Sequence, residues 1–182
     1  MLATYDRFYL EHVIELSKSE KIVFIDNVLS DKNVMLLERD TVFNPHLYDL
    51  VRKHKLQKPL DDLIFVVNRL EMADIMARTL ELIKQTPYLQ SLCKSLPQRE
   101  LPISTISHIT PNSILLNKLT VMQRRLPELF DHAIQVAIMA IAIGIELRVA
   151  GPLLDMLATA GLLHDLGELH INPQLHGVKT KL

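Results

Sequence analysis

Two histidines and an aspartate are the residues of this chain whose types and spacing best fit metal chemistry. His132 stands near the start of a long apolar stretch, and His164 is followed directly by Asp165. Two imidazoles and a carboxylate suit zinc, manganese, iron or nickel, and these ligand types alone do not choose among the four metals. We therefore expect a divalent transition metal as the cofactor, with His132, His164 and Asp165 as its ligands.

The spacing along the chain predicts that the two histidines meet. If residues 127–148 and 153–165 form an antiparallel pair of helices, His132 precedes a turn at position 150 by 18 residues and His164 follows it by 14. At a rise of 1.5 Å per residue these separations are about 27 and 21 Å, so both side chains lie at the same end of the pair, offset by roughly one helical turn. The alternative is that both histidines are ordinary surface residues at helix ends.

The other polar candidates carry less chemistry. A lone cysteine, Cys93, has no CxxC pattern beside it, and we expect it to be a small residue on a helix. One cysteine cannot form an internal disulfide, which is typical of proteins from a reducing compartment, so we expect a cytoplasmic location. Five histidines lack a carboxylate pattern and are expected at the surface: His12, His46, His54, His108 and His176.

The composition argues against several classes of protein. The 182 residues carry a net charge of −1 and are 48% hydrophobic, which disfavours a disordered chain and a binder of nucleic-acid polymers. The longest apolar stretch, 133–147, is interrupted by Gln135, Gly144 and Glu146, and it falls short of the roughly 18–20 apolar residues of a membrane span. We expect this stretch to be a core helix, and we expect no membrane partner.

Residues 1–67 predict a small N-terminal α+β unit. Apolar residues recur three or four positions apart where a helix is expected, whereas β-branched and aromatic residues gather in short runs where strands are expected. The expected elements are a helix over 6–18, a β-hairpin of 22–25 and 34–37 around polar residues 30–33, a helix from Asn44-Pro45 to about 55, and a strand at 64–67.

Residues 68–182 predict a bundle of helices that has to position the three candidate ligands. The expected elements are a long helix from 68 that ends at Thr86-Pro87, a connector at 97–111, a helix capped at Thr110-Pro111, a helix that begins at Pro127, a turn at Gly151-Pro152 and an apolar helix over 153–165. The predicted fold class is therefore mostly α with α+β character.

Part of this helical region resembles a known family. His132, the apolar helix VAIMAIAIGIEL and the segment AGLLHDLGELHINPQL resemble the first half of an HD-domain metal-dependent phosphohydrolase, over about residues 128–176. The most similar branch is HD-GYP, whose active members hydrolyse cyclic di-GMP. Residues 1–67 also resemble N-terminal domains that precede such modules.

The resemblance implies a reaction and a ligand. Metal ions in that family activate a water molecule for attack on phosphorus and stabilise charge on the phosphoryl oxygens. His132 would be the first histidine ligand, and Asp165, beside His164, would be the catalytic residue, able to bridge two metal ions. A phosphoester or a cyclic dinucleotide is therefore the expected small-molecule partner.

The chain departs from the HD-GYP pattern at two points. Glu168 stands where these proteins usually carry a lysine, and a carboxylate there repels a phosphodiester, unless Glu168 is simply a solvated residue. The chain ends 17 residues after Asp165, and His170 and His176 are the only histidines beyond it, so the family's later ligands and the GYP signature are absent. We expect an HD-type helical bundle that is incomplete at its C-terminal end.

Two functions fit these features. The first is an HD-GYP-like phosphohydrolase that is incomplete or impaired in this chain. The second is a catalytically inactive HD-like or HDOD-like module for signalling or scaffolding, which Glu168 and the absent ligands favour; a fragment of a longer protein is compatible with either. Apolar stripes on the helices at 68–84 and 112–148 would lack their usual cover, so we expect a homo-oligomer formed through exposed apolar helices.

Overall fold

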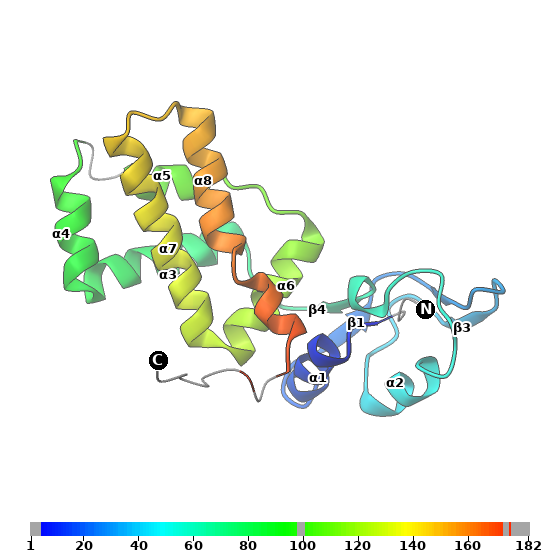
Figure 1. Ribbon diagram of the computed structural model, residues 1–182. Coiled ribbons are helices and arrows are strands. Elements are labelled where there is room, and N and C mark those ends of the chain that lie inside the picture. Colours follow the sequence, from blue (N-terminus) through cyan, green and yellow to red (C-terminus); the bar gives the residue numbers. More distant parts are fainter. Residues whose placement is uncertain (1–4, 98–100, 173–174, 176–182) are drawn as a thin grey trace. The chain divides into compact units, whose positions relative to one another are not determined.

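Two compact units make up the chain (Figure 1). The structure, a computed structural model, describes residues 5–97, 101–172 and 175. The N-terminal unit comprises residues 1–69 and 167–182, and the helical unit comprises residues 70–166. The fold is mostly α with some β structure, as the sequence predicts. The segment after residue 166 groups with the N-terminal unit rather than with the helices that precede it.

The N-terminal unit combines helices with short strands. Its elements are α1 (Arg7–Leu16), β1 (Ile22–Phe24), β2 (Val28–Leu29), β3 (Met35–Leu37), α2 (Pro45–Val51), the 3-10 turn η1 (Leu60–Asp62) and β4 (Ile64–Val66). Side chains cap α1 and α2, since Asp6 accepts from the amide of Tyr9 and Asn44 accepts from the amide of Leu47. The helix start predicted at Asn44 is confirmed.

The strands pair differently from the predicted hairpin. β1 pairs antiparallel with β4, with Ile22 opposite Val66, and β2 pairs with β3. The predicted pairing of 22–25 with 34–37 is therefore wrong, whereas β4 confirms the third predicted strand. Burial explains the difference: every residue of β4 is buried, whereas Met35 of β3 is more than half exposed, so the apolar β1 joins the core through β4.

One histidine of the N-terminal unit lies inside the core. His12 is 5% exposed and shares the buried side of α1 with Tyr9, Val13 and Leu16. Residues three and four positions apart lie on one side of a helix, so this set forms a single buried face. The surface position predicted for His12 is wrong, whereas His46 and His54 are exposed as predicted.

The helical unit contains the elements that position the candidate ligands. They are α3 (Met72–Gln85), α4 (Pro87–Ser95), α5 (Leu101–Ser107), α6 (Ser113–Arg125), α7 (Pro127–Glu146) and α8 (Gly151–Leu163), and the 3-10 turn η2 (Leu166–His170) leads out of the unit. The predicted end of α3 at Thr86 and the predicted start of α7 at Pro127 are both confirmed.

Two sequence predictions in this unit are wrong. The connector predicted at 97–111 contains α5, because Pro102 occupies the first turn of that helix, where a missing amide leaves no hydrogen bond unmade. The cap of α6 is Asn112 rather than Thr110, since the Asn112 side chain accepts from the amide of Leu115. Helix α4, which follows Thr86, was not among the predicted elements.

Helices α7 and α8 form the antiparallel hairpin that the sequence predicts (Figure 1). The connection between them passes through Arg148, whose φ of 55° lies in the left-handed region. The two helices approach most closely at Gly161, where an added Cβ would lie 2.6 Å from Cα and 2.9 Å from N of Ala137. Only glycine fits this crossing without a shift of one helix.

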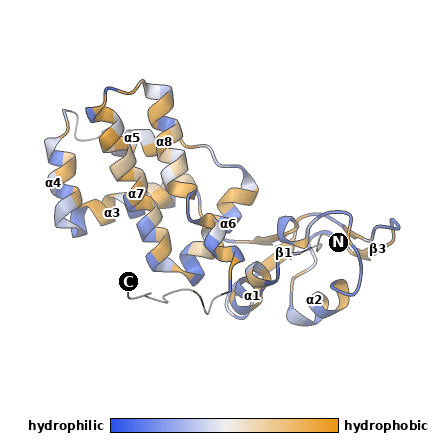
Figure 2. Cartoon of the chain, in the orientation of Figure 1, coloured by the Kyte–Doolittle hydropathy of each residue, from blue (hydrophilic) through white to orange (hydrophobic). Residues whose placement is uncertain are grey.

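Helix α7 is apolar on more than one side. Its 20 residues are long and apolar enough to cross a membrane by length and composition, a test that the core helix of a soluble protein also passes. One side packs into the core through Phe130, Ala133, Ile134, Ala137, Ile138 and Ile141. Figure 2 shows the apolar colouring continuing along α7 and α8.

Candidate metal centre

His132 of α7 meets His164 and Asp165 at the end of α8. One ligand atom from each side chain lies within 4.8 Å of the other two. Nε2 of His164 is 3.0 Å from Oδ2 of Asp165, and Nε2 of His132 is 3.7 Å from the same oxygen. The centroids of the two imidazole rings are 5.5 Å apart. The structure thus brings together the three residues that the sequence predicts as ligands, which we call the triad.

A backbone carbonyl fixes the orientation of His164. Its Nδ1 lies 2.8 Å from the carbonyl oxygen of Gly161. Because a carbonyl oxygen only accepts hydrogen bonds, Nδ1 must carry the proton, and in a neutral imidazole Nε2 then presents a lone pair. This lone pair lies 3.0 Å from Oδ2 of Asp165, which is also an acceptor. The geometry therefore places two acceptors face to face.

Facing acceptors need a positive charge between them. A proton on Nε2 of His164 would form an ion pair with Asp165 alone, whereas a cation could serve both groups and His132 at once. Ligand atoms about 2.1 Å from a metal lie about 3.0 Å apart along an octahedral edge and about 3.4 Å apart along a tetrahedral edge. The separations of 3.0 and 3.7 Å in the triad are close to these values, so the donor set fits a single divalent ion.

The triad is open to solvent. The side chains of His132, His164 and Asp165 are 54%, 35% and 27% exposed. Three protein ligands leave coordination positions for other molecules, which is the arrangement of metal sites that exchange a ligand rather than of closed structural sites. Water or a small anion therefore has access to this end of the hairpin.

An ion pair that the sequence does not predict anchors the start of α7. Arg78 of α3 donates from Nε to Oδ1 of Asp131 at 2.8 Å and from a terminal nitrogen to Oδ2 at 2.5 Å. Hydrogen bonds to Asp131, and then to Glu81, raise the pKa of Arg78 above its ordinary value, so the guanidinium stays charged. Asp131 directly precedes His132, so this fork holds the helix turn from which the first candidate ligand projects.

Gly161 is a second residue whose role the sequence does not predict. Its carbonyl orients His164, and its missing side chain lets α8 approach Ala137, five residues after His132. The signal that could have found it is a glycine inside an apolar helical segment, because glycine costs about 1 kcal/mol relative to alanine there and needs a packing reason.

Other histidines from the sequence prediction lie apart from the triad. Nδ1 of His108 lies 3.1 Å from Oδ1 of Asp155, at the rim of an apolar groove of about 500 Å³ beside α8. The sequence does not predict this carboxylate partner, because the two residues are far apart in the chain. His170 stacks on Tyr9 within the N-terminal unit, with 5.4 Å between ring centroids. His176 lies outside the described residues.

Two further residues from the sequence prediction are placed by the structure. Cys93 is buried in α4, and this burial raises the pKa of its thiol, which keeps it protonated near neutral pH and removes it as a thiolate ligand. Glu168 lies in η2 and is half-buried.

Comparison with known proteins identifies a family for the second half of the chain. No curated protein and no solved structure matches this chain. The match is to the HDOD domain and covers residues 104–178, a range that contains α6, α7, α8 and the triad. The HD-GYP branch is not part of this finding. Residues 104–178 are thus similar to an HDOD domain, a relative of the HD superfamily.

Proposed function

We propose that the helical unit is an HD-like signalling module in which the triad binds one divalent transition metal ion. The observation that carries this proposal is the orientation of His164. Its Nδ1 is engaged by the carbonyl of Gly161, so its Nε2 faces Asp165 as an acceptor and the pair calls for a cation. His132 supplies a third donor at 3.7 Å from the same carboxylate oxygen. Similarity to the HDOD domain supports the signalling role.

The donor set favours some metals over others. Two imidazoles and a carboxylate are ligands of intermediate character, which suit zinc, manganese, iron and nickel better than calcium or magnesium. Because the donors do not separate these four metals, loading the metal-free protein with each in turn is part of the test.

The test is metal binding by matched histidine variants. We expect the full-length protein, stripped of metal and titrated by calorimetry with each of the four ions, to bind one ion per chain. His164→Ala should abolish this binding. His108→Ala is the matched control, since His108 also lies about 3 Å from a carboxylate in the same unit but has no second imidazole beside it among the described residues, and it should bind metal like the wild type. Failure of the wild-type protein to bind any of these ions would overturn the proposal.

A second candidate function is hydrolysis of a phosphoester, and the exposure of the triad favours it. A bound divalent ion would supply polarisation of a phosphoryl oxygen and activation of water. The protein's own part would be to hold the two imidazoles and Asp165 in place at a solvent-accessible surface. Cyclic di-GMP is the specific substrate that this candidate names.

Turnover separates the two candidates. Metal-loaded protein should be incubated with bis(p-nitrophenyl) phosphate and with cyclic di-GMP, beside His164→Ala and His108→Ala. Stoichiometric metal without hydrolysis supports the signalling module. Hydrolysis that His164→Ala removes and His108→Ala retains supports the phosphohydrolase instead.

A further inference from the structure

An apolar surface on α7 and α8 lies outside the core. Its six large side chains are 37–71% exposed: Met139, Ile143 and Leu147 at the end of α7, and Leu153, Met156 and Leu157 on α8. On α7 these residues continue a row that starts at Glu128 and His132 and advances at helical spacing. On α8 the row ends at His164. We call this surface the α7–α8 face; the triad lies at one end of it.

Contacts at two levels make this face continuous. At one end His132 and His164 meet in the triad. Farther along the hairpin, Cδ1 of Leu157 lies 3.0 Å from the position that a Cβ on Gly144 would take, so Leu157 packs on α7 beside Ile143. The exposed rows of the two helices therefore form one surface.

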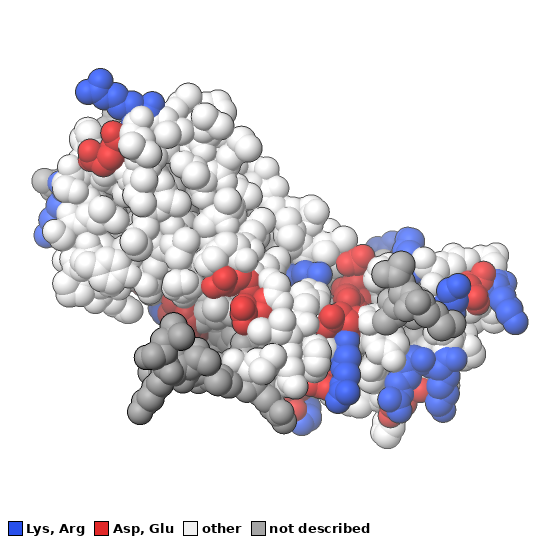
Figure 3. Space-filling view, viewed as in Figure 1, with Lys and Arg blue, Asp and Glu red and all other residues white. Residues whose placement is uncertain are grey.

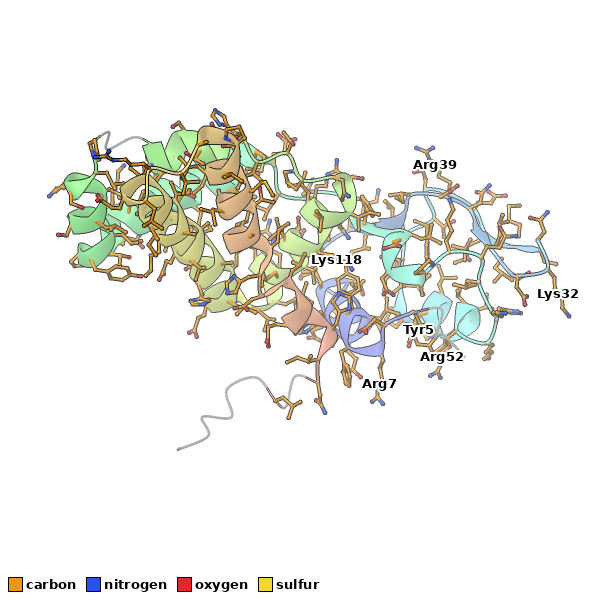
Figure 4. All side chains as sticks on the ribbon, turned by 45° about the horizontal axis from the view of Figure 1, so that its top comes forward. Tyr5, Arg7, Lys32, Arg39, Arg52 and Lys118 are labelled. Atoms are coloured by element: carbon orange, nitrogen blue, oxygen red, sulfur yellow. The ribbon has the colours of Figure 1, made fainter. Side chains whose placement is uncertain are left out.

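Charged residues are confined to the margins of the face. Figure 3 shows the side of the helical unit formed by α7 and α8 as almost entirely white, with Lys, Arg, Asp and Glu at its edges. The N-terminal unit differs: its basic side chains project outward, as Arg7, Lys32, Arg39 and Arg52 do in Figure 4, and several of them pair with neighbouring carboxylates. An uncharged surface of this kind is typical of an interface.

The exposed area is sufficient for association. Side chains of nearly 200 Å² each, exposed to this degree, present roughly 600 Å² per copy, so two copies face to face would bury about 1,200 Å², the lower bound of specific interfaces. The face is also at the upper end of the apolar patches found on monomers, about 300–600 Å².

We propose that the partner of the α7–α8 face is a second copy of this chain, packed with its α7 antiparallel. The charges at the two ends of the exposed row are opposite, with Glu128 at the start and Arg148 just after the end. These residues are about 30 Å apart along the helix. A two-fold axis near Met139 places Glu128 of each copy beside Arg148 of the other, and it places apolar side chains against apolar side chains between them.

A membrane surface fits the face less well. Helices that lie on membranes flank their apolar side with lysine and arginine, which attract anionic lipids. The margins of the α7–α8 face instead carry the carboxylates Glu128, Glu146 and Asp155 beside the cation Arg148. A second copy satisfies both the apolar centre and the opposite charges of the two ends.

Sedimentation velocity of the full chain over a range of concentrations tests the proposal. We expect a dimer for the wild type, and for Ile143→Asp a dissociation constant raised by about 100-fold or more, because a charge would lie at the centre of an apolar interface. Val34→Asp is the matched control, because Val34 is 57% exposed and Ile143 is 58% exposed, and it should leave the dimer unchanged. Circular dichroism confirms that each variant folds.

Charge exchange tests the antiparallel arrangement. Glu128→Arg and Arg148→Glu should each weaken the dimer by about tenfold, and the double variant should recover most of that loss. A wild-type chain that stays monomeric at every concentration overturns the proposal, as does an Ile143→Asp variant that dimerises like the wild type. Binding of the monomer to phosphatidylglycerol vesicles, abolished by Ile143→Asp, would identify a membrane as the occupant instead.

Discussion

The helical unit contains two histidine–carboxylate pairs of nearly equal length that are oriented in opposite ways. In the first, Nδ1 of His108 lies 3.1 Å from Asp155, and nothing in the described part of the chain bonds the other ring nitrogen. A neutral His108 can therefore donate to the carboxylate. In the second, Gly161 takes the proton of His164, so Nε2 faces Asp165 as an acceptor at 3.0 Å.

The difference teaches that a short distance between a histidine and a carboxylate does not by itself indicate a metal site. The deciding features are what the far side of the ring contacts and whether another donor is near. His164 has a carbonyl behind it and His132 in front, whereas His108 has neither a carbonyl nor a second imidazole among the described residues. The pair at His108 thus serves as an internal reference for the triad.

Exchanging the two aspartates for asparagine is the strongest way to test this comparison. Asp165→Asn should weaken metal binding by about 100-fold or more, since even outer-shell partners of metal ligands contribute 10–100-fold. Asp155→Asn should leave it within about twofold. The side-chain amide introduced at position 165 can donate to Nε2 of His164, so the metal-free variant should unfold at no lower urea concentration than the wild type. Calorimetry and urea titration measure both effects, and equal metal affinities would contradict the comparison.

The glycine behind His164 provides the next test. Gly161→Ala places a Cβ 2.6 Å from the backbone of Ala137, so we expect a net loss of about 1–2 kcal/mol in unfolding free energy after the gain in helix propensity. The displaced α8 should also weaken metal binding. Gly151→Ala is the control, because a Cβ there meets nothing within 4 Å. The outcome that counts against this role is an equal urea midpoint for both variants.

The ion pair before His132 should have a smaller effect. Arg78→Gln leaves Asp131 without its bidentate partner, so we expect a loss of about 1–2 kcal/mol in unfolding free energy and a modest decrease in metal affinity. Glu81→Gln removes only the exposed half of the network and should cost less than about 0.5 kcal/mol. Thermal and urea unfolding of the two variants would show the difference.

The smallest effect is expected at the reference pair itself. His108→Gln should change the unfolding free energy by no more than about 0.5 kcal/mol, because the pair with Asp155 is largely exposed and screened by salt. A larger loss, measured by urea unfolding at low and high salt, would mean that this pair has a structural role that the comparison does not give it.

The sequence predicts the parts of the fold that depend on local signals. Asn44 with Pro45, Thr86 with Pro87 and Pro127 mark helix ends because capping and proline geometry act over a few residues. The convergence of His132 with His164 also follows from helix rise alone. Strand pairing depended on burial instead, so the partner of β1 was predicted wrongly.

The missed features of the site depend on long-range packing. Arg78 and Asp131 are separated by 53 residues, and no local pattern relates them. The role of Gly161 depends on the closeness of α7, which appears only when both helices are in place. His12 was placed at the surface because a histidine on an amphipathic helix is usually solvated, yet it lies on the buried face of α1.

The return of the chain to the N-terminal unit determines when that unit can be completed during synthesis. His170 stacks on Tyr9 and lies 3.5 Å from Asp6, so these contacts cannot form until residue 170 has left the ribosome. About a hundred residues separate it from the end of the first segment, which at ordinary elongation rates takes roughly 5–20 s. The nascent N-terminal unit therefore waits for its last ring contact while the helices of the other unit emerge and fold first.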